Sequence, residues 1–160
     1  MPPASPLAYV ASHGDGGRRR RRDMRIAAVL AEFGYRTHVA PAGPALGIGP
    51  EMLEEVEQAQ LVVCDLVCPH RDLPVEVAIA ATRGLAVLAL IPADAELDGM
   101  AAQLLRECGA DVVRYDRAEP HQVLHAWLGS GSRRWSSGGR PSCRASSRSR
   151  RRSRALRGRP

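Results

Sequence analysis

Residues 59–80, AQLVVCDLVCPHRDLPVEVAIA, decide the fold. They open with the run 61–64, which is apolar, β-branched and short, as in a strand buried on both faces of a sheet. Asp65 ends this strand, and Pro74 stands where a helix takes its first residue, with Glu76 in the first helical turn. The stretch therefore predicts a carboxylate at the carboxyl edge of a parallel strand, which is where open α/β sheets bind ligands.

Strands and helices are expected to alternate on both sides of this stretch. Runs of strand length occupy 7–11, 35–40, 61–64, 85–91 and 111–115, and apolar residues at helical spacing mark 23–33, 50–59, 74–83, 97–108 and 120–128. Because right-handed crossovers place each helix over the sheet, we expect one doubly wound α/β domain with a five-stranded parallel sheet in the flavodoxin-like order 2-1-3-4-5. In that order, the glycine loop 12–17 and the segment 68–76 face each other across one crevice.

Charge divides the chain into a body and a tail. Residues 1–128 hold 12 arginines against 17 acidic residues, a net charge of −5, whereas residues 129–160 hold 11 arginines and no acid, a net charge of +11. We expect a disordered lead-in at 1–6, the α/β domain at 7–128 and a disordered Arg/Ser-rich tail at 129–160, whose few apolar residues cannot offset the entropy of ordering. Only this tail could bind nucleic acid, through contacts of its arginines with phosphates. The alternative is that the tail is a solvated appendage.

Cysteine spacing and hydropathy indicate the cellular compartment in which we expect the protein. The four cysteines lack the paired short spacings of a zinc site, so we expect reduced and mostly buried thiols. The longest apolar run, 85–93, is too short to span a bilayer, and no basic segment followed by a long apolar one opens the chain. We therefore expect a cytoplasmic protein without membrane contact.

A glutamate that faces a glycine loop allows two kinds of chemistry. The carboxylate of Glu76 could accept hydrogen bonds from sugar hydroxyls, or it could attack an anomeric carbon and form a covalent glycosyl-enzyme. Spacing alone leaves both open, together with a plainer role in which the acid complements the helix dipole. Asp65 is either a turn residue or a catalytic residue. Tyr9 lies in an apolar strand, so it is either a residue of the hydrophobic core or a residue of the active site.

The stretch LVVCDLVCPHRDLPVEVAIAATRGLAVLALI, residues 61–91, resembles the core of the nucleoside 2-deoxyribosyltransferase-like superfamily. The shared pattern is an apolar strand ending in an acid, a variable loop, a glutamate at a helix start, a turn and another apolar strand. Within the superfamily, the chain is most similar to the 2′-deoxynucleoside 5′-phosphate N-hydrolases and related nucleotide N-glycosidases, over about residues 7–128. The resemblance implies cleavage of the N-glycosidic bond of a nucleoside or nucleoside 5′-monophosphate, by hydrolysis or deoxyribosyl transfer, with no metal or redox cofactor.

The resemblance also implies roles for individual residues. Glu76 would be the nucleophile on C1′ of the sugar, and Tyr9 would orient its carboxylate. Backbone N–H groups of the glycine loop would cradle the 5′ end of the substrate, and a protonated His70 could serve a 5′-phosphate. The family's homodimer would bring the region near Met100 to the neighbouring subunit's pocket. The candidate substrate-binding residues are Ser12, His13, Gly14, Gly16, Gly17, His70, Asp72 and Met100.

Met52 is the main departure from the family pattern, because family members place an Asp there that assists the leaving base. Glu51, Glu54 and Glu55 are near, yet a helix turns by about 100° per residue, so a neighbour is expected to point elsewhere. Asp72 also replaces a small glycine position of the loop. The alternative function is therefore a catalytically impaired nucleotide-binding or regulatory module of the same fold.

Overall fold

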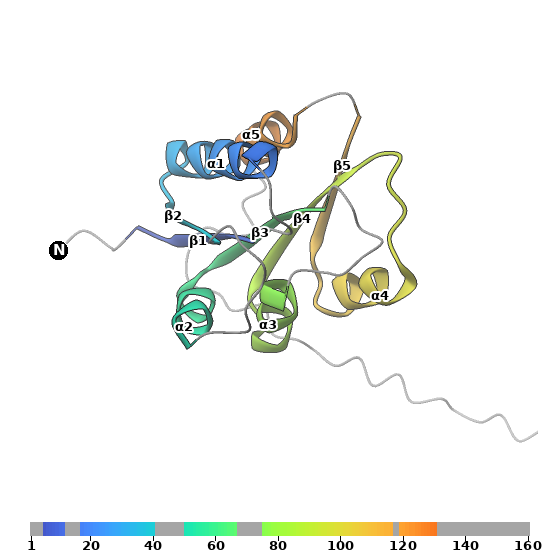
Figure 1. Ribbon diagram of the computed structural model, residues 1–160, viewed down its shortest axis with the longest axis horizontal. Helices are drawn as coiled ribbons and strands as arrows, with labels where there is room; N and C mark the ends of the chain where they lie inside the picture. The colour runs from blue at the N-terminus through green and yellow to red at the C-terminus, as the bar shows by residue number, and fades with distance from the viewer. Residues whose placement is uncertain (1–4, 12–16, 41–49, 67–74, 117–118, 131–160) are drawn as a thin grey trace, which may run out of the picture.

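Strand and helix alternate five times along the chain in a computed structural model, which describes residues 5–11, 17–40, 50–66, 75–116 and 119–130 (Figure 1). The strands are β1 (Leu7–Ala11), β2 (Arg36–Val39), β3 (Leu61–Asp65), β4 (Ala86–Pro92) and β5 (Asp111–Tyr115). The helices are α1 (Gly17–Glu32), α2 (Pro50–Gln58), α3 (Val75–Arg83), α4 (Gly99–Glu107) and α5 (Pro120–Gly129). Each run expected to form a strand does so.

The strands form one parallel sheet in the order β2-β1-β3-β4-β5, which confirms the expected flavodoxin-like order. In its register, Tyr9 on β1 lies between His38 on β2 and Val62 on β3. The strand order reverses at β1 and β3, and ligands of open α/β sheets bind beyond the carboxyl ends of such a pair. Helix α3, which follows β3, therefore begins beside the expected binding edge.

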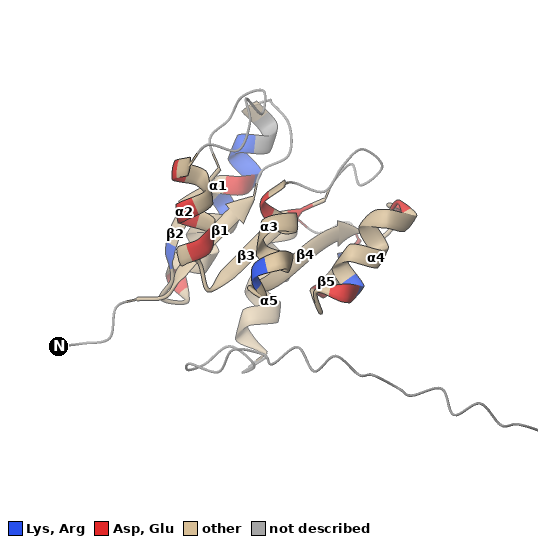
Figure 2. Cartoon of the chain, turned by 90° about the horizontal axis from the view of Figure 1, so that it is seen from below, with Lys and Arg blue, Asp and Glu red and all other residues tan. Residues whose placement is uncertain are grey.

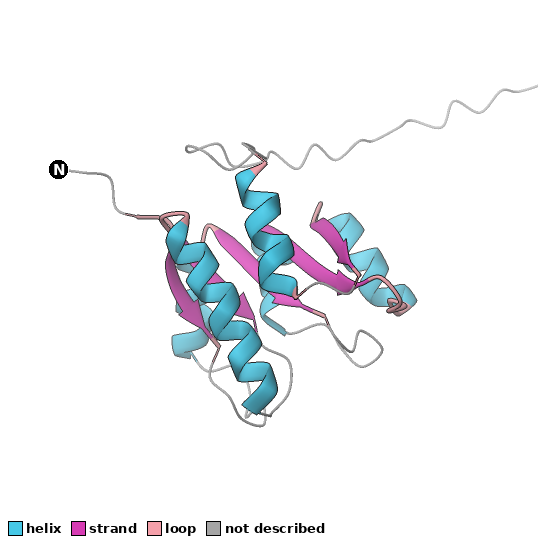
Figure 3. Ribbon diagram, turned by 90° about the horizontal axis from the view of Figure 1, so that it is seen from above, coloured by secondary structure: helices cyan, strands magenta, loops and turns pink. Residues whose placement is uncertain are grey.

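Helices cover both faces of the sheet (Figures 1 and 3). Helices α1 and α5 pack side by side over one face, whereas α2, α3 and α4 cover the other. Side chains of a strand alternate between the two faces: on β3, Val62 and Cys64 belong to the core under α2–α4, and Leu61 and Val63 to the core under α1 and α5. Tyr9 belongs to the core under α2–α4.

Helix α1 begins at Gly17, earlier than the start at residue 23 that apolar spacing predicts. Its first turns hold the arginine run 18–22, which contains no apolar residue, although arginine is a good helix former. Figure 2 shows arginines gathered at the amino-terminal part of this helix. The Nη1 of Arg20 donates to the carbonyl oxygen of Ala40 at 2.9 Å. The start of α1 is thereby tied to the carboxyl end of β2.

No helix among the described residues is long and apolar enough to cross a lipid bilayer. Helix α5 closes the described part of the fold, with Leu124 buried against the sheet. The disorder expected of the tail, 129–160, and of the lead-in, 1–6, falls mainly on residues 131–160 and 1–4, which lie outside the described residues. Gly129 is the last residue of α5.

Candidate active site

Glu76 is a buried carboxylate in the first turn of α3. Only 9% of the residue is exposed, on the side of the sheet that α2, α3 and α4 cover. Burial raises the pKa of this carboxyl above its ordinary value, because the charged form loses hydration, and a backbone hydrogen bond within the residue opposes the shift. A desolvated acid at a sheet's carboxyl edge is a frequent feature of functional sites.

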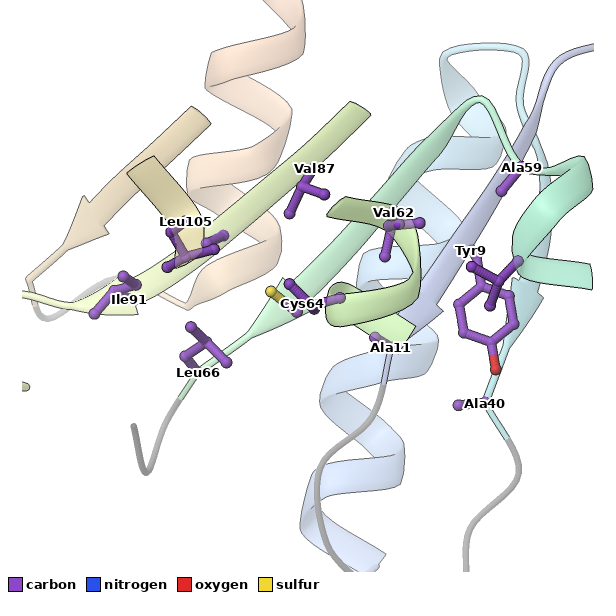
Figure 4. Close-up of a cluster of buried hydrophobic side chains, with 14 residues drawn as sticks. Tyr9, Ala11, Ala40, Ala59, Val62, Cys64, Leu66, Val87, Ile91 and Leu105 are labelled. Carbon is purple, nitrogen blue, oxygen red and sulfur yellow. The ribbon is translucent and has the colours of Figure 1, made fainter. Parts of the chain in front are cut away.

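Tyr9 is a fully buried tyrosine on the same face of the sheet. Its hydroxyl oxygen has no hydrogen-bond partner among the residues that the structure describes. Figure 4 shows this oxygen on the side of Ala40, which follows the carboxyl end of β2, and away from Ala59. Leaving a buried hydroxyl unpaired costs about 1–3 kcal/mol, so a hydrogen-bond partner outside the described residues or a bound ligand would stabilise this orientation.

Two negative charges act on the Tyr9 hydroxyl. Burial raises the pKa of Tyr9 far above its ordinary range, and the carboxylates of Glu76 and then Glu55 raise it further. The hydroxyl therefore stays protonated at physiological pH, so it can donate its proton in a hydrogen bond as well as accept one. A protonated, buried tyrosine hydroxyl can donate to a carboxylate or to a substrate oxygen.

His38 and Glu55 lie next to Tyr9 and its stacked ring, although no local sequence signal marks them as candidates. The imidazole of His38 stacks on the ring of Tyr9, with ring centroids 5.2 Å apart and planes at 17°. Its Nε2 lies 2.8 Å from Oε2 of Glu55 on α2. The strand register pairs His38 with Tyr9, so the sheet order together with the register was the signal that could have found it.

Asp65 lies on the opposite face of the sheet from Tyr9, because it follows Cys64 on β3. The Nε of Arg22 donates to its Oδ2 at 3.0 Å, and the hydroxyl of Tyr115 donates to its Oδ1 at 2.8 Å. Arg22 also donates from Nη2 to the Tyr115 hydroxyl at 2.7 Å. This closed network supports the interpretation of Asp65 as a residue that joins β3, α1 and β5, while its catalytic role stays a prediction.

Most of the expected substrate-binding residues lie outside the described residues: Ser12, His13, Gly14, Gly16, His70 and Asp72. Gly17 is the first residue of α1. Met100 lies in the first turn of α4 and is 75% exposed, and α4 packs beside α3 on the same face of the sheet. The predicted contact of this region with a neighbouring subunit stays a prediction.

A hollow of about 670 Å³ lies elsewhere, between the segment after β4, helix α4 and strand β5. Its lining residues are Ala93, Asp94, Ala95, Glu96, Leu97, Ala102, Leu105, Arg106, Ala110, Val112 and Arg114. Neither Tyr9 nor Glu76 borders it, so it is separate from the candidate site. Within the described ranges, no group of three or more His, Cys, Asp or Glu residues could hold a metal ion.

In sequence, no family model and no curated protein matches the chain. In structure, the chain is similar to the CMP N-glycosidase BcmB of Clostridium botulinum, with a TM-score of 0.56 and 14% identity over 77% of this chain and 98% of that one. It is also similar to the 2-deoxyribosyltransferase of Bacillus psychrosaccharolyticus, with a TM-score of 0.54 and 12% identity over 74% and 90%.

A third similar structure is a pilus assembly-related protein of Burkholderia pseudomallei, with a TM-score of 0.50 and 19% identity over 85% and 94% of the two chains. Identities this low establish a shared fold. Unrelated functions use flavodoxin-like folds, so activity has to be argued from the site.

Proposed function

We propose that the protein cleaves the N-glycosidic bond of a nucleoside or nucleoside 5′-monophosphate, with Glu76 as the nucleophile and Tyr9 as the residue that positions it. The observation that carries the proposal is the placement, on one face of the sheet, of a buried carboxylate and a buried hydroxyl that has no partner among the described residues, beside the switch point of β1 and β3. The fold shared with a CMP N-glycosidase and a 2-deoxyribosyltransferase is consistent with it.

The chemistry follows from these two groups. Glu76 attacks C1′ of the sugar, the C1′–N bond breaks, and its electron pair leaves with the base. The glycosyl ester on Glu76 is then resolved by water, which gives hydrolysis, or by a second base, which gives transfer. Desolvation favours the first step because a carboxylate with little hydration gains more from bond formation with the developing oxocarbenium ion.

Tyr9 supports this step by donating a hydrogen bond. Its hydroxyl has no other acceptor among the described residues, and both the Glu76 carboxylate and the ring or 3′ oxygen of a sugar would accept from it. A phenylalanine would fill the same space without the donor. The role is therefore one of positioning, and it predicts a loss of rate without a loss of fold.

Release of free base from a panel of nucleosides and nucleoside 5′-monophosphates tests the proposal. The wild-type protein is expected to release base from at least one member, and Glu76→Gln, which keeps the side-chain volume, to lose about 10³-fold or more of that rate. Glu57→Gln is the matched control, because Glu57 lies on α2 in a surface ion pair with Arg83. Equal rates for wild type and Glu76→Gln would remove the assignment.

A second candidate function is a nucleotide-binding or regulatory module without turnover. It is motivated by Met52, which is partly buried against the core under α2–α4 and brings no acid to the position where the family pattern has one. Calorimetry distinguishes the two: nucleotide binding without base release from any substrate supports this alternative. Binding with release supports the enzyme.

We further propose that the protein forms a homodimer through the surface that includes Met100, a large apolar side chain with 75% exposure. Met100→Asp is expected to shift the sedimentation coefficient from that of a dimer to that of a monomer. A wild-type protein that sediments as a monomer at all concentrations would contradict this assembly.

A further inference from the structure

The hollow of about 670 Å³ beside α4 and β5 has no role in the proposed function. We infer that it binds a small zwitterion with an apolar side chain, which is the chemistry that a free amino acid and a short peptide share. The inference goes beyond the proposed function and does not depend on it, because neither Tyr9 nor Glu76 borders the hollow. Ligand sites commonly have volumes of about 300–1,000 Å³, so the hollow has the size of one.

Three segments form the walls of the hollow: α4, β5 and the segment that follows β4. On α4, Ala102, Leu105 and Arg106 are three and four positions apart, so they share one side of the helix. On β5, Val112 and Arg114 are two positions apart, so they point to the same face of the sheet. Each of these two walls therefore combines an apolar surface with one guanidinium group.

Hydrogen bonds hold the segment after β4 against β5. The Nη1 of Arg114 donates to the carbonyl oxygen of Ala95 at 3.0 Å, and to those of Pro92 and Ala93 at 3.4 Å each. The backbone N–H of Ala93 donates to the carbonyl oxygen of Tyr115 at 2.8 Å. Two walls of the hollow are thus joined before any ligand binds, which lowers the entropic cost of binding.

Charged side chains of both signs line the hollow. Asp94 and Glu96 come from the segment after β4, whereas Arg106 comes from α4 and Arg114 from β5. Among the described residues, the side chains of Asp94, Glu96 and Arg106 form no ion pair or hydrogen bond. The hydrogen bonds of Arg114 to that part of the chain all come from Nη1, so its Nε and Nη2 can still bind a carboxylate. A ligand with one ammonium group and one carboxylate would complement both kinds of charge.

Apolar side chains lie between these charged groups. Leu105 is buried, whereas Val112 is 44% exposed on β5, the last strand of the described sheet. An apolar ligand side chain that covers Val112 removes this surface from water, which favours binding. The combination of an apolar surface with charges of both signs therefore fits an amino acid or a peptide with a leucine-like side chain better than it fits an inorganic ion.

Nuclear magnetic resonance of the isotope-labelled full chain tests the inference. Leucine and the tripeptide leucyl-alanyl-leucine are expected to cause saturable shifts of the backbone amide signals of Glu96, Arg106 and Val112, without changes in α1 on the opposite face of the sheet. N-acetyl-leucine lacks the ammonium group and leucine amide lacks the carboxylate, so each should bind about tenfold more weakly than leucine. Tighter binding of the tripeptide than of leucine identifies a peptide as the ligand, and the reverse order identifies a free amino acid.

Substitutions separate the contributions of the walls. Arg106→Gln is expected to lower the affinity for leucine about tenfold and to leave that for leucine amide unchanged, and Glu96→Gln should do the same with N-acetyl-leucine as the insensitive probe. Ala102→Leu fills the hollow without changing its charge and should weaken the binding of every probe. Arg25→Gln is the matched control, because Arg25 is an exposed arginine of α1. Thermal unfolding shows whether each variant is folded.

Selective losses in folded Arg106→Gln and Glu96→Gln proteins support the inference. The absence of a saturable shift with both leucine and the tripeptide overturns it. Equal affinity for leucine and its two blocked forms also overturns it, as do Arg106→Gln and Glu96→Gln proteins that bind every probe as the wild type does. Base release depends on Glu76 and not on the hollow, so a failure of the proposed function is distinguishable from a failure of this inference.

Discussion

Two buried tyrosines on opposite faces of one sheet differ in the hydrogen bonds that their hydroxyl groups make. Tyr115 is 8% exposed, accepts a hydrogen bond from Arg22 and donates one to Asp65. Tyr9 is fully buried, and its hydroxyl has no partner in the described part of the chain. Burial raises the pKa of both phenols, so neither ionises near neutral pH. Of these two hydroxyls, only that of Tyr115 belongs to a network that joins elements of the described part of the fold.

The polar groups around these two tyrosines therefore form two different arrangements. Around Asp65, an acid, a base and a phenol satisfy one another and join α1, β3 and β5. Around Tyr9, an imidazole stacks on the ring, two carboxylates raise the pKa of the phenol, and the hydroxyl has no hydrogen-bond partner among the described residues. Substitutions on the first side should change stability, and substitutions on the second side should change activity.

The largest effect on stability is expected for Asp65→Asn. The change leaves the Arg22 guanidinium without its counter-ion, and because Arg22 keeps partial exposure the cost should be about 2–3 kcal/mol, below that of a fully buried pair. Urea unfolding at neutral pH measures it. A folded Asp65→Asn protein should keep most of its kcat; a collapse of kcat without a change in stability would instead support a catalytic role for Asp65.

A smaller difference should separate the two tyrosine-to-phenylalanine variants. Tyr115→Phe removes a hydroxyl with two partners and should lower the free energy of unfolding by about 1–2 kcal/mol. Tyr9→Phe removes a hydroxyl without a described partner and should leave stability unchanged or slightly higher, while base release falls. The comparison would be wrong if Tyr9→Phe were the more destabilising of the two.

The smallest effect is expected from the ionisation of Glu76. Its pKa is raised in the folded state, so the folded protein favours the protonated form, and this contribution to stability is fully present at pH values below the ordinary carboxyl pKa and is lost as pH rises through the folded-state pKa. Glu76→Gln removes the cost of burying the charge. The variant should therefore be more stable than wild type at pH 7, and this advantage should disappear toward about pH 4.

Glu57→Gln serves as the control for that measurement, because its surface ion pair should contribute less than about 1 kcal/mol. Unfolding curves at a series of pH values provide the comparison. An advantage of Glu76→Gln that is the same at every pH, or a variant less stable than wild type at pH 7, would contradict a desolvated carboxylate at this position.

Much of the fold could be predicted because its signals are local. The β-branched run at 61–65 and the glycines after α1, α3 and α4 at positive φ mark strands and helix ends without knowledge of the tertiary structure. The start of α1 could not be located by the same means, because the arginines that open it carry no apolar periodicity.

The site could be predicted only in part. Glu76 becomes a candidate because a helix start after a buried strand is a sequence signal, and Tyr9 becomes a candidate only through the family resemblance. His38 and Glu55 depend on which strand pairs with β1 and on how α2 is rotated against the sheet, and both are properties of tertiary packing. Side chains alternate between the two faces along β3, which places Asp65 on the opposite face from Tyr9. This conclusion requires knowing that β1 and β3 pair in one sheet.

Trapping of the covalent intermediate would identify the side chain that attacks the sugar. A substrate analogue with fluorine at C2′ slows the resolution of a glycosyl ester, and trypsin, which cleaves after arginine, would place Glu76 in the peptide 72–83 and Asp65 and Glu55 in the peptide 37–71. The account predicts a mass increase equal to the fluorinated sugar on peptide 72–83, with fragmentation assigning it to Glu76. The same mass on peptide 37–71 would contradict it.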